Sequence, residues 1–219
     1  MPVLKVNSVK VYYEVAGTGH PTLLLPPLVR VDKLLKSFPK ALAEKYTAIT
    51  VDLIEHSFSY GPKDMKLYSY ERLARYCCQL VGHMKISRHD VVGMSWTGRI
   101  ALTYILLHQD NVRALILIAS SGPTQKPINP PESPESSEGE RFVMEIAWKT
   151  PFDVSQDLKK IHVPTLILIG DQDPRLESAR LMHKNIPKST MKIVEGVGHE
   201  IDAATCTENV LSWLEELPT

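Results

Sequence analysis

Short apolar runs alternate with longer amphipathic stretches along most of the 219-residue chain. The apolar runs are rich in β-branched residues and have the length of strands, whereas the stretches between them repeat apolar residues at helical spacing. Two of the runs, Val112–Ala119 and Val163–Ile169, are almost continuously apolar, as expected of strands that are covered on both faces. The alternation therefore predicts an α/β fold, with a mostly parallel twisted sheet flanked by helices.

The pattern places its elements at definite positions along the chain. It predicts strands at Val9–Val15, Thr22–Leu25, Tyr46–Leu53, Asp90–Met94, Val112–Ala119, Val163–Ile169 and Thr190–Val194. It predicts helices at Tyr68–Met84, Gly98–His108, Pro174–Ile186 and Ile201–Leu217. The first strand alternates apolar and polar residues, which favours an antiparallel strand at the edge of the sheet.

One segment interrupts this alternation. Residues Pro123–Glu140 hold five of the chain's 16 prolines and four glutamates, so they can bury little apolar surface. The stretch that follows, Arg141–Trp148, is apolar enough for one short helix. Because strands and helices alternate on both sides, we interpret residues of about 123–150 as a short cap or loop insertion in a single domain spanning residues 1–219.

Composition narrows the function classes. The 25 basic and 25 acidic side chains balance, and a large nucleic-acid footprint would need a basic surplus. No apolar run is long enough to predict a membrane span, and Met1–Lys10 has no secretory-signal pattern. The three cysteines are an odd number without CxxC spacing, and no His or Cys pair has zinc-ligand spacing. These features predict a cytoplasmic protein with free thiols and no metal.

The first candidate for chemistry is Ser95, within the hexapeptide GMSWTG between a predicted strand and a predicted helix. A serine at such a junction sits on a sharp turn that exposes its hydroxyl, and small residues are needed two positions away on each side. Gly93 satisfies this requirement, whereas Thr97 stands where the second glycine is usual and Gly98 follows it. The simpler alternative is that Ser95 only caps the helix.

A nucleophilic serine needs a general base and an acidic partner that orients the base. GDQDP, containing Asp173, follows the strand Val163–Ile169, and EGVGHE, containing His199, follows the strand Thr190–Val194. Open α/β sheets place their sites at the carboxyl ends of strands, so these side chains are expected near Ser95. Ser95, His199 and Asp173 are thus predicted to be a catalytic triad that needs no cofactor.

With these motifs the chain resembles the serine-nucleophile branch of the α/β-hydrolase superfamily over nearly its whole length. The matches are GMSWTG, GVGHE and the stretch IHVPTLILIGDQDP, in which the family's G-x-x-D pattern selects Asp173 and leaves Asp171 as the alternative acid. The resemblance implies an oxyanion hole made of the Trp96 and Leu28 amides. The sharp strand-to-helix turn that carries Ser95 is called the elbow below. A serine at this elbow argues against the dehalogenase and epoxide-hydrolase branches, which use an aspartate there.

The sequence departs from the family in two loops. Pro26 and Pro27 replace the usual His-Gly after a strand, and proline has no N–H to donate, which leaves Leu28 as the donor. The D-x-x-G-x-G-x-S loop retains Asp52 and Ser59, but both of its glycines are replaced.

The short insertion predicts a reduced cap and a solvent-open serine. Val29, Met144 and Trp148 are candidate substrate-binding residues, although Met144 and Trp148 are equally well explained as core residues. The two cations nearest the predicted site, Arg30 and Arg175, are interpreted as solvated loop residues.

We expect a small-molecule carboxylic ester as the substrate, with an acyl-enzyme formed on Ser95. Thioesterase, lactonase and carbon–carbon hydrolase activities remain open within the same branch. The alternatives from other classes are a hydrolase-like binding protein that has lost catalysis, and a hydroxynitrile lyase of the same fold. The oligomeric state is not predicted.

Overall fold

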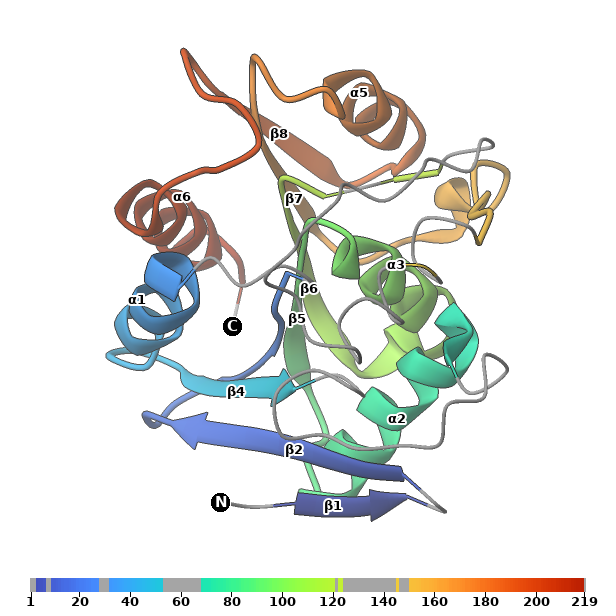
Figure 1. Ribbon diagram of the computed structural model, residues 1–219, viewed down its shortest axis with the longest axis vertical. Helices are drawn as coiled ribbons and strands as arrows, with labels where there is room; N and C mark the ends of the chain where they lie inside the picture. The colour runs from blue at the N-terminus through green and yellow to red at the C-terminus, as the bar shows by residue number, and fades with distance from the viewer. Residues whose placement is uncertain are drawn as a thin grey trace.

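The computed structural model describes residues 3–6, 9–27, 32–52, 68–120, 122–123, 145 and 150–218. Within these residues, eight strands form one twisted sheet in the order β1-β2-β4-β3-β5-β6-β7-β8 (Figure 1). The strands are β1 (Val3–Val6), β2 (Val9–Ala16), β3 (Pro21–Leu25), β4 (Thr47–Asp52), β5 (His89–Met94), β6 (Val112–Ile118), β7 (Thr165–Gly170) and β8 (Ser189–Val194).

The sheet is parallel from β4 to β8 and antiparallel only at its N-terminal edge, where β2 pairs with both β1 and β4. Every residue of β5 and β7 is buried, as expected of strands with helices on both faces. The predicted α/β fold with a mostly parallel sheet is confirmed.

The predicted position of the first strand was wrong in one respect. Val9–Val15 corresponds to β2 and is antiparallel, but it is not at the edge, because β1 pairs outside it with Val3 opposite Tyr12. With only four residues, β1 is too short to give a recognisable alternation.

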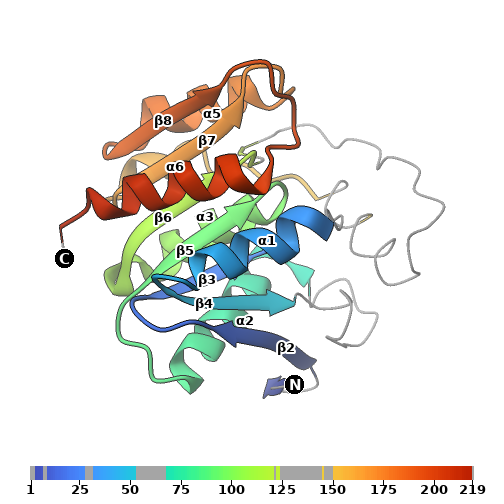
Figure 2. The same ribbon diagram turned by 90° about the vertical axis from the view of Figure 1, so that its left-hand side faces the viewer.

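Helices cover both faces of the sheet (Figures 1 and 2). On one face α1 (Asp32–Leu42) packs against α6 (Ala203–Glu215), and on the other lie α2 (Tyr70–His83), α3 (Thr97–His108) and α5 (Leu176–Asn185). The sequence pattern did not predict α1, which contains Pro39. A proline inside a helix removes a backbone donor, so it argues against a helix until tertiary packing is known.

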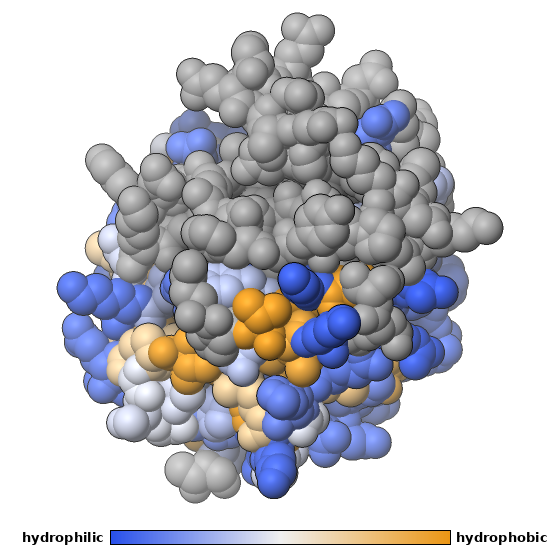
Figure 3. Space-filling model, turned by 60° about the horizontal axis from the view of Figure 1, so that its bottom comes forward, coloured by the Kyte–Doolittle hydropathy of each residue, from blue (hydrophilic) through white to orange (hydrophobic). Residues whose placement is uncertain are grey.

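Two further findings concern the outside of the molecule. On the surface that includes the lower side of Figure 1, the described residues are mainly hydrophilic and surround a small group of hydrophobic ones (Figure 3). Among the described residues, no helix is long and apolar enough to cross a membrane. The predicted insertion, about 123–150, and its candidate helix lie almost entirely outside the described residues.

Candidate active site

Ser95 occupies the sharp turn between β5 and α3. Its backbone φ is +54°, a left-handed conformation that a non-glycine residue rarely adopts. The Ser95 N–H donates to the carbonyl oxygen of Ile118 on β6 at 3.0 Å, which holds the turn against the end of the neighbouring strand. The side chain is partly exposed at the carboxyl edge of the sheet. This strained strand–turn–helix junction is the geometry that presents a serine hydroxyl to a substrate.

Two glycines allow α3 to pack closely against the end of β5 and against the residues that follow β6. A Cβ atom on Gly93 would lie 2.7 Å from the Cβ of Ala101, and one on Gly98 would lie 2.5 Å from the Cβ of Ser120. Both distances are far shorter than van der Waals contact, so either substitution would force the backbone apart. Gly98 therefore supplies the close approach on the helix side, one position later than the usual glycine.

Thr97 stands at the position where the family usually has glycine. Its fully buried hydroxyl accepts a hydrogen bond from the Met94 N–H at 2.9 Å. The hydroxyl proton faces two carbonyl oxygens, that of Leu25 at 2.7 Å and that of Met94 at 2.8 Å. The Thr97 hydroxyl thus joins the turn that carries Ser95 to the end of β3.

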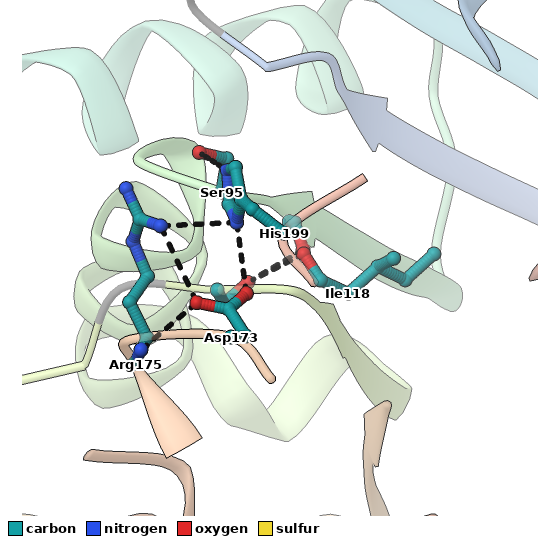
Figure 4. A network of polar contacts seen from close by, with 7 residues as sticks. Ser95, Ile118, Asp173, Arg175 and His199 are labelled. Atoms are coloured by element: carbon teal, nitrogen blue, oxygen red, sulfur yellow. Dashed lines mark hydrogen bonds and ion pairs between the residues drawn. The ribbon is translucent and has the colours of Figure 1, made fainter. Parts of the chain in front are cut away.

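The structure brings Ser95, His199 and Asp173 into one line of contacts (Figure 4). The Oγ of Ser95 lies 3.0 Å from Nε2 of His199, and Nδ1 of His199 lies 2.8 Å from Oδ2 of Asp173. Asp173 comes from the loop after β7 and His199 from the loop after β8. These loops pack closely because Gly170 has no side chain, since a Cβ there would collide with the carbonyl oxygens of Val197 and Gly198.

The charge state of Asp173 fixes how the imidazole is oriented. Burial acts to raise the pKa of this carboxyl, but the hydrogen bonds from His199 and the Arg175 backbone, and the charges of both residues, outweigh burial and lower it. Asp173 is therefore ionised at neutral pH and accepts the Nδ1 proton of His199. With the proton on Nδ1, Nε2 is the ring nitrogen whose lone pair faces the hydroxyl of Ser95.

Asp171, the alternative acid, is placed differently. It is exposed, and its Oδ1 accepts a hydrogen bond from the backbone N–H of Val197 at 3.2 Å. It therefore supports the loop that carries His199, while Asp173 contacts the imidazole itself.

Arg175 is not the solvated loop residue that the sequence suggested. Its side chain is only 22% exposed, and its Nη1 lies 3.4 Å from Oδ1 of Asp173 and 3.0 Å from Nδ1 of His199. Its backbone N–H also donates to Oδ1 of Asp173 at 2.8 Å. The available signal was its position two residues after the acid, where a turn brings the backbone N–H back to the carboxylate.

Known proteins share this architecture. A family model described as "alpha/beta hydrolase fold" matches residues 32–139. An esterase from Exiguobacterium antarcticum superposes with a TM-score of 0.84 at 23% identity, covering 98% of both chains. The chain has the α/β-hydrolase fold. A bromoperoxidase from Bacillus anthracis superposes with a TM-score of 0.83 at 22% identity, covering 98% of this chain and 99% of the other.

A curated relative of this α/β-hydrolase-fold chain is similar over a shorter stretch. A soluble epoxide hydrolase from Corynebacterium sp. (strain C12) is 26% identical over 113 residues, which are 52% of this chain. The match spans only 39% of that relative's length. The relatives thus share a fold with this chain while carrying names of different activities.

Behind the elbow of this α/β-hydrolase fold lies a buried aromatic and cationic cluster. Nε1 of Trp96 donates to the hydroxyl oxygen of Tyr70 at 3.2 Å, and Nη1 of Arg99 donates to the same oxygen at 3.0 Å. The Phe152 ring lies 4.8 Å from the Tyr70 ring and 5.7 Å from the Arg99 guanidinium carbon. The cluster fixes the Trp96 side chain directly after the serine. Sequence patterns did not indicate it, because its members are far apart along the chain.

The remaining predicted site residues are not described. Leu28, Val29, Met144 and Trp148 lie outside the described residues, as do Arg30 and Ser59. Within the parts of the chain that the structure describes, no three His, Cys, Asp or Glu side chains are grouped so that they could hold a metal ion.

Proposed function

We propose that the protein is a serine hydrolase that cleaves carboxylic esters through an acyl-enzyme on Ser95. The observation that carries the proposal is the continuous line of contacts from Ser95 through His199 to Asp173, with the serine held at a positive φ. A helix-capping serine would need neither the strained backbone nor an imidazole at hydrogen-bond distance.

In the proposed mechanism, Nε2 of His199 takes the hydroxyl proton as Ser95 attacks the ester carbonyl carbon. The ionised Asp173 holds the Nδ1–H of the imidazole and stabilises the positive charge that develops on it. The backbone N–H of Trp96 follows the nucleophile at the start of α3, where it can donate to the carbonyl oxygen as that oxygen becomes negative. We propose the Leu28 N–H as the second donor.

The remaining steps return the enzyme to its starting state. The imidazolium gives its proton to the alkoxide oxygen of the leaving alcohol, and the acyl group stays on the Ser95 oxygen. A water molecule then gives one proton to Nε2 of His199 and attacks the acyl carbon. The carboxylic acid leaves and Ser95 regains its proton, so one ester bond and one water are consumed in each cycle.

The residue at the elbow supports an ester substrate over an epoxide. The epoxide-hydrolase branch attacks with an aspartate at this position, and this chain has Ser95 there. We therefore base the proposed substrate on the serine at this position and not on the activity named for the epoxide hydrolase. We further propose Val29, Met144 and Trp148 as contacts for the substrate, which we take to be a small cytoplasmic ester.

The experiment combines covalent labelling with pre-steady-state kinetics. A fluorophosphonate probe should attach to Ser95, located by peptide mass spectrometry, and a p-nitrophenyl ester should give a burst of about one p-nitrophenol per chain. Ser95→Ala should abolish both signals. The control is Ser120→Ala, which removes a neighbouring buried hydroxyl that donates to the Gly93 carbonyl oxygen and should leave labelling intact. If the folded wild-type protein neither labels nor turns over a graded ester panel, the proposal is wrong.

A further inference from the structure

Arg175 contacts the acid–base pair although the proposed mechanism assigns it no role. It lies at the N-terminal boundary of α5, two residues after Asp173. Its backbone N–H and its Nη1 approach Oδ1 of Asp173 at 2.8 and 3.4 Å. Figure 4 shows the guanidinium reaching both the carboxylate and the imidazole of His199. One residue therefore contacts two of the three predicted catalytic side chains.

The contacts divide the two oxygens of Asp173 between two partners. Oδ1 faces Arg175, and Oδ2 faces Nδ1 of His199 at 2.8 Å. Rotating the carboxylate would break contacts on both sides at once, and its side chain is fully buried. Arg175 thus keeps Oδ2 directed at the imidazole.

The guanidinium also lies beside the place where a positive charge would form. Nη1 of Arg175 is 3.0 Å from Nδ1 of His199. That ring nitrogen donates its proton to Asp173, so it has no lone pair to accept one from Arg175. The short distance is therefore a contact between a permanent cation and an N–H group, which places the guanidinium against both partners of the Asp173–His199 contact.

Other charged groups lie around His199. Asp173 and Arg175 approach it from the β7–α5 loop, and Ser95 from the elbow. Asp171 contacts the backbone of the histidine's loop, Glu200 is exposed next to it, and Asp202 caps the N-terminus of α6. Arg175 brings a cation to within 3.0 Å of this imidazole.

We propose that Arg175 is a positioning residue that fixes the Asp173 carboxylate so that Oδ2 stays directed at Nδ1 of His199. A carboxylate held in this way keeps the Nδ1–H in place and Nε2 directed at Ser95. The catalytic part of this inference rests on the proposed function, whereas the effect on the orientation of the imidazole does not.

The first test measures the imidazole directly. The Nδ1–H proton of His199 is observed by NMR at one neutral pH in the wild-type protein, Arg175→Met, Arg175→Lys and Arg180→Met, with His199→Gln to assign the signal. Arg175→Met removes the guanidinium and keeps the backbone donor, so the Nδ1–H should exchange faster with water and its signal should broaden. Arg175→Lys should restore most of the sharp signal. Arg180, which pairs with Glu177 on α5, is the matched control, and its replacement should leave the signal unchanged.

The second test measures catalysis by the same four proteins. With a p-nitrophenyl ester, Arg175→Met should lower kcat by about tenfold and leave KM near the wild-type value, because the orientation of the carboxylate affects proton transfer and not substrate binding. An unchanged Nδ1–H signal and an unchanged kcat in folded Arg175→Met, or an equal loss in Arg180→Met, would overturn the proposal. If Arg175→Met does not fold, Arg175→Gln is measured in its place. An NMR difference between wild type and variant without Ser95 labelling of the wild type would refute the ester-hydrolase function and leave the effect of Arg175 on the Asp173–His199 contact standing.

Discussion

Two buried aspartates lie at opposite ends of the same sheet, and each contacts an arginine and a histidine. At the amino ends of β5 and β6, Arg113 binds both oxygens of Asp90 at 2.9 and 2.6 Å, and His20 approaches only to 3.5 Å. At the carboxyl ends of β7 and β8, Asp173 is 2.8 Å from His199, while the guanidinium of Arg175 stays at 3.4 Å.

The difference shows how the same residue types serve structure in one place and chemistry in another. At Asp90 the bidentate arginine uses both carboxylate oxygens and holds two strands together, and this hydrogen bonding raises the pKa of Arg113. At Asp173 one oxygen is left for the imidazole of His199, which we propose exchanges protons with Ser95. The orientation of the arginine, more than its presence, distinguishes the two sites.

The comparison predicts that neutralising Asp173 abolishes activity. Asp173→Asn should lower kcat for a p-nitrophenyl ester by about 10⁴-fold, because an amide cannot hold the imidazole in the tautomer that accepts the Ser95 proton. Asp171→Asn is the matched control, since it changes a carboxylate that contacts only the loop backbone, and should retain activity within about tenfold. Equal losses of kcat in Asp173→Asn and Asp171→Asn would contradict the different roles assigned to the two aspartates.

Neutralising Asp90 should instead affect stability. Asp90→Asn leaves Arg113 without its anionic partner in a nearly buried position, which should lower the free energy of unfolding by about 3–5 kcal/mol. Urea denaturation measures the loss, and kcat at a temperature where the variant is folded should remain near that of the wild type. A large fall in kcat in fully folded Asp90→Asn would show that the two ends of the sheet are coupled.

Thr97 is a buried polar residue like Asp90, but it lies in the turn that carries Ser95. Thr97→Val keeps the shape and removes the hydroxyl, leaving the Met94 N–H without its acceptor, so stability should fall by about 1–3 kcal/mol. Thr97→Ser retains the hydroxyl and is the control. Thermal denaturation of the three proteins checks this, and a stable Thr97→Val would mean that the hydroxyl contributes nothing to the turn.

The smallest effect should be on acid stability. The pKa of Asp173 in the folded protein is lowered from 3.8, so its stabilising contribution is present above that value and is lost as the pH falls through the lower folded value. The wild-type protein should therefore lose stability relative to Asp173→Asn as the pH falls below 3.8. Urea denaturation below this pH should show a flatter pH dependence for Asp173→Asn than for the wild type. Identical slopes would contradict the lowered pKa.

Sequence patterns predicted the sheet and its helices well, since buried parallel strands are long apolar runs. They also placed Ser95, Asp173 and His199 at strand ends, and the fold brings such ends together at one edge. The strand β1 and the helix α1 were missed because one is very short and the other contains Pro39.

The finer features of the candidate site depend on orientation, which a sequence pattern does not contain. Nothing in the motif GMSWTG shows that the Thr97 hydroxyl reaches the carbonyl oxygen of Leu25, 72 positions away. Likewise, GDQDP followed by arginine does not show whether Arg175 points to water or to the imidazole. Both are decided by packing between segments that are distant in the sequence.

Ser95 and its proposed base, His199, are 104 positions apart, and the loop that carries His199 follows β8, which pairs with β7. During synthesis, the elbow around Ser95 can form while the serine still has the weak reactivity of an ordinary alcohol. Labelling of Ser95 would therefore report on completed folding, because it requires that the last strand of the sheet has docked. A chain whose C-terminal strand and helix detach would lose this reactivity before the remainder of the sheet unfolds.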